Sequence, residues 1–227
     1  MFGCVERFLD PQYWIGMLMA VPAIVIGLTF HEYAHAWTAN RLGDPTARAL
    51  GRLTFNPIKH LSLIGTICFL IFRIGWAKPV PVNPENFKKP RKGMILVSVS
   101  GPTASLIIAI AFGLVARILS FIIPPDPSSA LATYLYTILV FGALLNTVFA
   151  IFNILPIPPL DGSQILFNLL PPRYNNIVMW LQRYGFFILL AFIVLLGPFL
   201  WLILGTPSML LSRLLVGDRI MSIIQYI

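Results

Sequence analysis

Residues 14–40, WIGMLMAVPAIVIGLTFHEYAHAWTAN, join a long apolar run to two histidines and a glutamate. Positions 14–30 are almost purely apolar, which is typical of a helix that crosses a lipid bilayer. His31, Glu32 and His35 then follow on what we expect to be the same helix. Ionisable groups next to hydrocarbon are expensive, so their presence at this depth predicts a functional site.

The composition is that of a protein dissolved in a bilayer. Of the 227 residues, 58% are hydrophobic and 11% are charged, and the mean hydropathy is +0.84. A soluble domain of this length could not bury so much apolar surface. The net charge of +8 does not indicate a nucleic-acid partner, because the position of charges in a membrane protein says more than their sum. Cys4 and Cys68 are too few and too scattered for a disulfide framework or a cysteine metal site.

The first apolar run is expected to stay in the mature protein. The region before it carries Glu6 and Asp10 against a single Arg7, so it lacks the basic start of a signal peptide. No small-residue cleavage site follows the run. The run therefore predicts a retained membrane span.

Five apolar stretches divide the chain: 14–30, 61–75, 94–123, 133–155 and 184–204. Four of them reach the roughly 20 residues that a spanning helix needs, if the first extends to residue 40. The 61–75 stretch is shorter and contains two glycines and Arg73. The loops 41–60 and 76–93 on either side of it are both strongly basic, which predicts that both stay in the cytoplasm. We therefore expect a re-entrant or hairpin segment around 61–93, with a short tilted span as the alternative.

The predicted fold is an all-α polytopic membrane protein with about four transmembrane helices plus that re-entrant or hairpin segment. We expect one membrane-embedded domain over residues 1–227, with a core at 14–170 and a C-terminal span and interfacial segment at 171–227. In this topology the N-terminus lies outside and 14–40 runs inward. The 94–123 helix runs out, 133–170 returns and 184–204 leaves again. Eleven of the sixteen lysines and arginines then fall in inner loops.

The HEYAH sequence has the spacing of a zinc site. His31 and His35 are four residues apart, so on a helix both imidazoles project from one face. Two such histidines suit a tetrahedral zinc ion, and Glu32 is placed to take a proton from a metal-bound water. The alternative is a pair of core histidines that donate to backbone carbonyls.

Asp161 is the expected third ligand, because it is the only other acid embedded in an apolar segment. It lies in NILPIPPLDG (153–162), where three prolines prevent a continuous helix. An unwound stretch inside a membrane indicates a cavity or site. The segment runs in the same direction as the first span, so Asp161 and the histidines are expected at similar depth. The alternative interpretation is a proline kink with Asp161 capping the next helix, a role that is compatible with metal ligation.

These motifs resemble the site-2 protease family of intramembrane zinc metalloproteases. HEYAH followed about 120 residues later by NILPIPPLDG carries the resemblance. The compact bacterial branch without a PDZ domain is similar in three further stretches: GDPTARALGRLTFNPIKH (43–60), GWAKPVPVNPENFKKPRKG (75–93) and SGPTAS (100–105). The resemblance covers about residues 14–170.

The resemblance implies a role for each site residue. His31, His35 and Asp161 would bind Zn2+, and Glu32 would activate the water. Asn153 would line the site and hydrogen-bond the substrate carbonyl or the developing oxyanion; its alternative role is to satisfy backbone groups freed by the prolines. The 75–93 stretch would lie near the substrate, where an extended substrate strand could pair.

Two positions depart from the branch. Ser62 stands where an aspartate is frequent, which weakens any catalytic role for His60, and Ser105 stands where an asparagine is frequent, which is expected to loosen a hydrogen bond in the cavity.

The expected function is hydrolysis of a peptide bond in or near the transmembrane segment of a single-span membrane protein. We expect the protein in the bacterial cell membrane, with its active site toward the cytoplasm. A membrane metal or ion transporter and an inactive relative that binds membrane helices are the alternatives. A di-iron enzyme needs about eight histidines and is excluded, since the chain has three.

Overall fold

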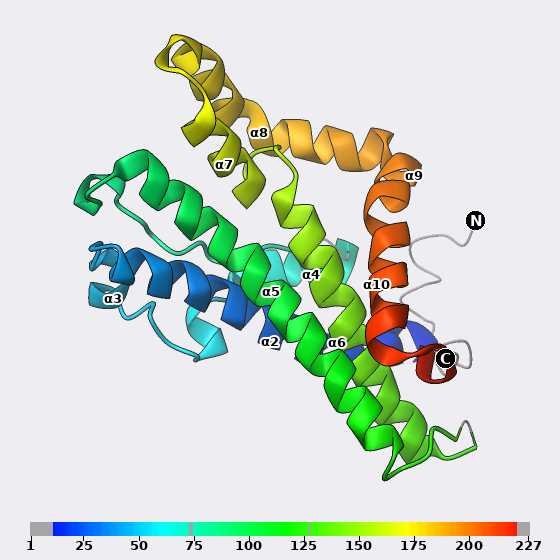
Figure 1. Ribbon diagram of the computed structural model, residues 1–227. Coiled ribbons are helices and arrows are strands. Elements are labelled where there is room, and N and C mark those ends of the chain that lie inside the picture. The colour runs from blue at the N-terminus through cyan, green and yellow to red at the C-terminus, as the bar shows by residue number, and fades with distance from the viewer. Residues whose placement is uncertain (1–10, 73–74, 127, 222–227) are drawn as a thin grey trace.

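The computed structural model describes residues 11–72, 75–126 and 128–221, and these form helices joined by short loops (Figure 1). No strand occurs among them, so the predicted all-α class is confirmed. Within these ranges, five helical segments are long and apolar enough to cross a membrane: Trp14–Arg41, Pro90–Ser120, Ala130–Ile154, Pro172–Leu195 and Gly197–Val216. The protein is therefore polytopic, with one candidate span more than the four predicted.

The additional span arises where the stretch 184–204 was expected to be continuous. Helix α8 (Asn175–Leu195) ends before Gly197, and the chain restarts as α9 (Gly197–Leu200), a π-helical turn and α10 (Thr206–Val216). Pro198 lies in the first turn of α9 and has no N–H with which to continue α8. Figure 1 shows the chain turning sharply at this point. The predicted boundaries of a single span over 184–204 are therefore wrong.

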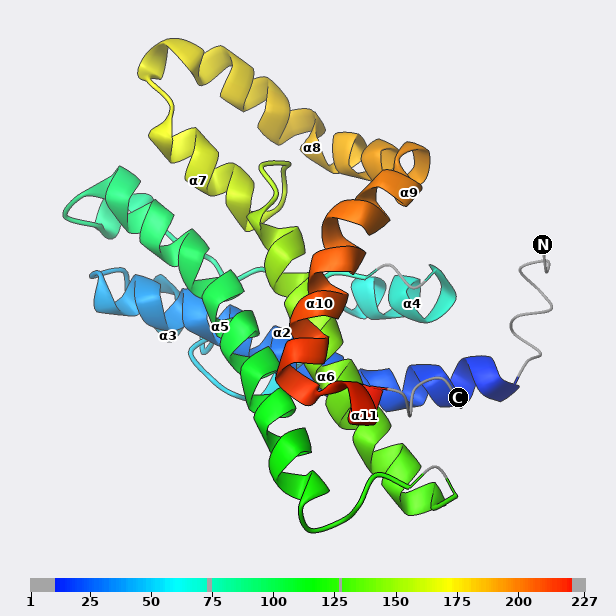
Figure 2. The same cartoon turned by 45° about the vertical axis from the view of Figure 1, so that its right-hand side comes forward.

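Three long helices form the centre of the molecule: α2 (Pro11–Arg41), α5 (Pro90–Ser120) and α6 (Ala130–Ile154). Both views show α2 crossing α5 and α6 (Figures 1 and 2). The amide of Asn146 on α6 joins the helices, because its Nδ2 donates to the carbonyls of Ala23 on α2 (3.3 Å) and Gly142 (2.8 Å). A side chain at Gly27 would collide with this amide, so glycine is what allows the close approach.

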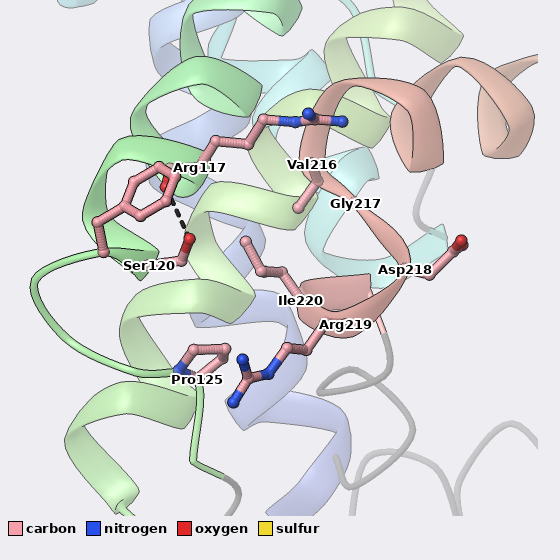
Figure 3. Close-up of a pocket in the computed structure, with 9 residues that line it drawn as sticks. Arg117, Ser120, Pro125, Val216, Gly217, Asp218, Arg219 and Ile220 are labelled. Atoms are coloured by element: carbon pink, nitrogen blue, oxygen red, sulfur yellow. Dashed lines mark hydrogen bonds between the residues drawn. The ribbon is translucent and has the colours of Figure 1, made fainter.

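Helix α10 packs against the C-terminal end of α5 and the N-terminal half of α6. The guanidinium of Arg117 donates to the carbonyls of Leu214 and Leu215 at the end of α10. A cavity of about 490 Å³ lies beside this contact, between the end of α5 and α11 (Asp218–Met221) (Figure 3). Its lining residues are Arg117, Ser120, Phe121, Pro125 and 216–220.

The segment after the first basic loop is a hairpin. Helix α4 (Leu63–Phe72) has ten residues, or about 15 Å, which is half the hydrocarbon thickness. Its flanking residues meet again, since Leu61 forms an antiparallel bridge with Ala77 and Lys78 N–H donates to the His60 carbonyl at 2.8 Å. A span would separate these ends by a whole bilayer. The predicted hairpin is therefore confirmed and the tilted span excluded, while Arg73 lies outside the described residues.

Candidate metal centre

Three potential metal ligands converge from two distant parts of the chain. The Nε2 atoms of His31 and His35 lie 3.0 Å apart, and the carboxylate of Asp161 lies 3.1 Å from the first and 3.3 Å from the second. Two ligands held 2.0–2.1 Å from a tetrahedral zinc ion are roughly 3.3 Å apart. The spacing of these three side chains therefore fits one zinc ion.

The proline-broken segment delivers Asp161 to the histidines. Helix α6 ends at Ile154, and α7 (Asp161–Leu169) starts with the aspartate itself. Gly162 lies against the carbonyls of Ile154 and Leu155, where a methyl group would collide with both. Leu160 rather than Asp161 occupies the N-cap position, so the capping interpretation is wrong. Asp161 Oδ2 is buried and, apart from its 3.1 Å approach to His31 Nε2, has no hydrogen-bond partner in the described part of the chain, as a ligand atom facing an ion would be.

Helix α5 orients both imidazoles through contacts with their Nδ1 atoms. His35 Nδ1 lies 2.8 Å from the Val97 carbonyl, which can only accept, so Nδ1 carries the proton. His31 Nδ1 lies 3.0 Å from Ser105 Oγ, which in turn donates to the Gly101 carbonyl at 3.3 Å. These partners leave both Nε2 atoms free to face a metal, the arrangement that outer-shell hydrogen bonds give to metal-binding histidines.

Gly101 brings the backbone of α5 against the two rings. A methyl carbon at this position would stand 2.5 Å from Cε1 of His35 and 2.7 Å from Cε1 of His31, against 3.4–4 Å for ordinary contact. It would be nearer still to Nε2 of His35. The glycine of the SGPTAS sequence therefore lets α5 pack closely against the rings of both histidines.

Glu32 lies beside these ligands and is 7% exposed. Its Oε2 accepts a hydrogen bond from Val80 N–H at 3.1 Å. Val80 belongs to the extended segment 77–83, which follows the α4 hairpin. The Glu32 carboxylate thus lies in the same cavity as the three potential ligands, and one of its oxygens accepts a hydrogen bond from a backbone amide.

Glu32 and the three potential ligands open onto one cavity of about 820 Å³. Its polar lining includes Glu32, the three potential ligands and Asn153. Its apolar lining includes Phe186, Leu189, Leu190 and Ile193 of α8 and Trp76 of the hairpin. The cavity can therefore accept an apolar chain alongside a metal ion and the Glu32 carboxylate.

The other predicted residues separate into two groups. Asn153 lines the cavity about one helical turn before the prolines. Its Nδ2 donates to the Phe149 carbonyl at 2.9 Å. Its contact with substrate stays a prediction. His60 does not line this cavity, and its Nε2 donates to the Thr54 carbonyl at 2.8 Å. Ser62 Oγ accepts from Gly65 N–H at 3.2 Å at the start of α4.

The outer partners of the histidines lie on α5 and were not predicted from the sequence. Val97, Gly101 and Ser105 are spaced four residues apart, so they share one face of α5. That spacing was a usable signal that one helical face serves one site. Ser105 makes a hydrogen bond to His31 where a loosened one was expected.

Comparison with known proteins gives one family. The sequence model of Peptidase family M50 matches residues 19–196. "Putative zinc metalloprotease YwhC" of Bacillus subtilis is 41% identical over 201 residues, which are 87% of this chain and 90% of the relative. Rip2 of Mycolicibacterium smegmatis is 27% identical over 192 residues (82% of this chain, 71% of the relative), and MJ0611 of Methanocaldococcus jannaschii is 26% identical over 192 residues (84% and 76%). Both of these relatives are also named "Putative zinc metalloprotease".

No solved structure matches. The chain therefore belongs to Peptidase family M50, the site-2 protease family that its motifs resemble.

Proposed function

We propose that the protein is an intramembrane zinc metalloprotease that hydrolyses a peptide bond in or near the transmembrane segment of a single-span membrane protein. The observation that carries the proposal is the convergence of His31, His35 and Asp161 beside Glu32 in one cavity. Relatives of the chain are named "Putative zinc metalloprotease", which supports zinc as the cofactor.

Each residue then has a distinct task. His31, His35 and Asp161 hold the ion, which when bound supplies Lewis acidity toward the scissile carbonyl and its attacking water. Glu32 accepts the proton of that water and later delivers it to the leaving amine. Asn153, on the cavity wall, donates a hydrogen bond to the carbonyl oxygen of the substrate.

The cavity walls support an extended, apolar substrate. Trp76 and the α8 side chains contribute apolar surface to the cavity that also holds the potential ligands. A peptide bond within a helix is shielded by the helix itself, so the substrate has to unwind before Glu32 can act on it. An unwound chain fits between α8 and the extended segment 77–83, where part of its backbone pairs with that segment.

The active site faces the cytoplasm in this proposal. The loop after α2 and the segment before α5 are both basic, and both adjoin the ends of the helices that carry the site. Short basic loops remain on the cytoplasmic side of a bacterial cell membrane.

The test compares wild type with Glu32→Gln, both loaded with zinc in proteoliposomes. The probe is a panel of synthetic single-span peptides with apolar segments, with the products read by mass spectrometry. We expect wild type to cleave, and Glu32→Gln to keep one zinc per chain while losing cleavage by about 10²–10⁴-fold, the share that a positioned base contributes. Glu85→Gln removes an exposed carboxylate in the segment before α5 and serves as the matched control.

Three results would overturn this function. Cleavage by Glu32→Gln at the wild-type rate would remove the assigned base. Zinc flux across the liposomes without proteolysis would favour a transporter. A zinc-loaded wild type that binds the peptides and never cuts them would favour an inactive helix-binding relative.

A further inference from the structure

Two of the stretches that resemble the family contain none of the potential metal ligands, yet they contact one another. The first, GDPTARALGR (43–52), follows α2, and the second, AKPVPVN (77–83), follows the α4 hairpin. Arg52 and Asp44 of the first stretch are 6% and 0% exposed. Charged side chains this deeply buried have to be matched by hydrogen bonds, so their partners indicate what they do.

Arg52 holds the upstream part of the second stretch. Its Nη2 donates to the Lys78 carbonyl at 2.5 Å and its Nη1 to the Pro79 carbonyl at 3.2 Å. The forked guanidinium thus fixes two consecutive peptide units, which a single ammonium group cannot do. Lys78 N–H is held as well, by the His60 carbonyl.

Asp44 holds the downstream part. One carboxylate oxygen accepts from Asn83 N–H at 2.8 Å. The other accepts from the side chain of Asn86 at 2.7 Å and from both the N–H and the hydroxyl of Thr46. Asp44 therefore ties the loop that follows α2 to the end of the extended segment.

Val80 lies between these two clamps, and its N–H donates to Glu32 Oε2 at 3.1 Å. Its neighbours Pro79 and Pro81 have no N–H, so Val80 is the only backbone donor in this three-residue stretch. The prolines also restrict the backbone on either side. The position of this one donor is therefore set by Arg52 on one side and Asp44 on the other.

We propose that Arg52 and Asp44 are positioning residues for the protease reaction, acting through the Val80 amide on the carboxylate of Glu32. The inference rests on the proposed function, in which Glu32 is the base. With Oε2 engaged by Val80 N–H, Oε1 stays directed at the attacking water. A base displaced by about 1 Å costs on the order of 10²-fold in rate, so two buried charges distant from the metal influence catalysis.

The experiment is a double-mutant cycle on the zinc-loaded full chain, with the best-cleaved peptide of the panel as probe. Arg52→Ala removes the clamp, and Val80→Pro removes the donor. Each change is expected to lower kcat about 100-fold, with KM within about twofold and one zinc per chain retained. Because both changes break the same link, the double variant should be no slower than the slower single variant.

Three further variants separate positioning from folding. Arg52→Lys keeps the charge and reaches one of the two carbonyls, so it should recover part of the lost kcat. Val80→Ala keeps the N–H and measures the cost of the side chain alone. Arg48→Ala removes an exposed arginine of the same loop and should retain the wild-type kcat.

The proposal is overturned if Arg52→Ala keeps the wild-type kcat, or if the two losses multiply to about 10⁴-fold. It is also overturned if Arg52→Ala folds but loses its zinc. Should Arg52→Ala fail to fold, the kcat of Val80→Pro with Arg52 intact decides between the outcomes. An unchanged kcat would show that the hydrogen bond from Val80 N–H to Glu32 does not influence catalysis, and the proposal would be overturned. None of these results alters the comparison of Glu32→Gln with wild type, so the proposed function is judged separately.

Discussion

Gly101→Ala is the substitution whose effect follows most directly from the packing around the two histidines. The added methyl would need about 0.9 Å more room at His35 Cε1 to reach an ordinary 3.4 Å contact. Metal sites tolerate ligand displacements of only about 0.2 Å. The two rings or α5 itself must therefore move by several times that tolerance.

We expect the zinc affinity of Gly101→Ala to fall about 100-fold, which corresponds to about 2.7 kcal/mol. The affinity is measured by competition with a chromophoric chelator on purified protein in detergent. The direction of the change in zinc affinity is informative, because alanine in a helix is otherwise about 1 kcal/mol more favourable than glycine. A loss therefore cannot come from helix propensity.

Gly16→Ala is the matched control, since a methyl group there on α2 meets nothing within 4 Å. It should bind zinc as the wild type does. If Gly101→Ala also binds zinc with unchanged affinity and stoichiometry, α5 does not press on the histidines as described, and the role of the SGPTAS sequence would need another explanation.

Three further predictions concern the surroundings of the site. Ser105→Ala removes the oxygen beside His31 Nδ1, so zinc affinity should fall about 10–100-fold in the same competition assay. Gly27→Ala places a methyl against the Asn146 amide and should lower the free energy of unfolding by about 1–3 kcal/mol in detergent; adding Asn146→Ala should recover part of this loss. Burial raises the pKa of Asp44, but the hydrogen bonds from Thr46, Asn86 and Asn83 outweigh burial and lower it below its usual value. The carboxylate therefore stabilises the fold above its unfolded pKa of about 3.9, and this contribution is lost as the pH falls through the lower folded value. Asp44→Asn should unfold at a lower temperature at pH 7 and show a shallower decline below about pH 4, which thermal unfolding across pH measures.

The potential ligands that the structure brings together could be singled out from the sequence because the chain has so few ionisable groups. His31, Glu32 and His35 follow a helical spacing, and Asp161 stands alone among its apolar neighbours after three prolines. These signals are local, or depend on the high cost of a buried charge. They needed no knowledge of how the helices pack.

The hairpin around 61–93 was also predictable, from charge. Basic loops on both sides of a short apolar stretch require the chain to return to the side from which it came. The bridge between Leu61 and Ala77 is the structural counterpart of that requirement. By contrast, the turn at Gly197 was missed because an apolar stretch carries no charge that marks its middle, and only the Gly-Pro pair signalled it.

The helical spacing marks the face of α5 that serves the site, but the partners in the outer contacts were beyond sequence reasoning. The hydrogen bond between Val80 and Glu32 joins residues 48 positions apart, and that between Ser105 and His31 joins residues 74 positions apart. Such contacts depend on the register in which helices and loops meet. Ser105 illustrates this, because its hydroxyl reaches the imidazole only through the close approach of α5 at Gly101.

The most direct test of the account is the zinc content of the purified protein with and without Asp161. Wild type should carry one zinc per chain after dialysis, and Asp161→Ala should lose it. Asp126→Ala, which removes an exposed carboxylate in the loop after α5, should keep it. If Asp161→Ala retains one zinc per chain with the wild-type affinity, the aspartate that begins α7 does not complete the site and the proposed metal centre is wrong.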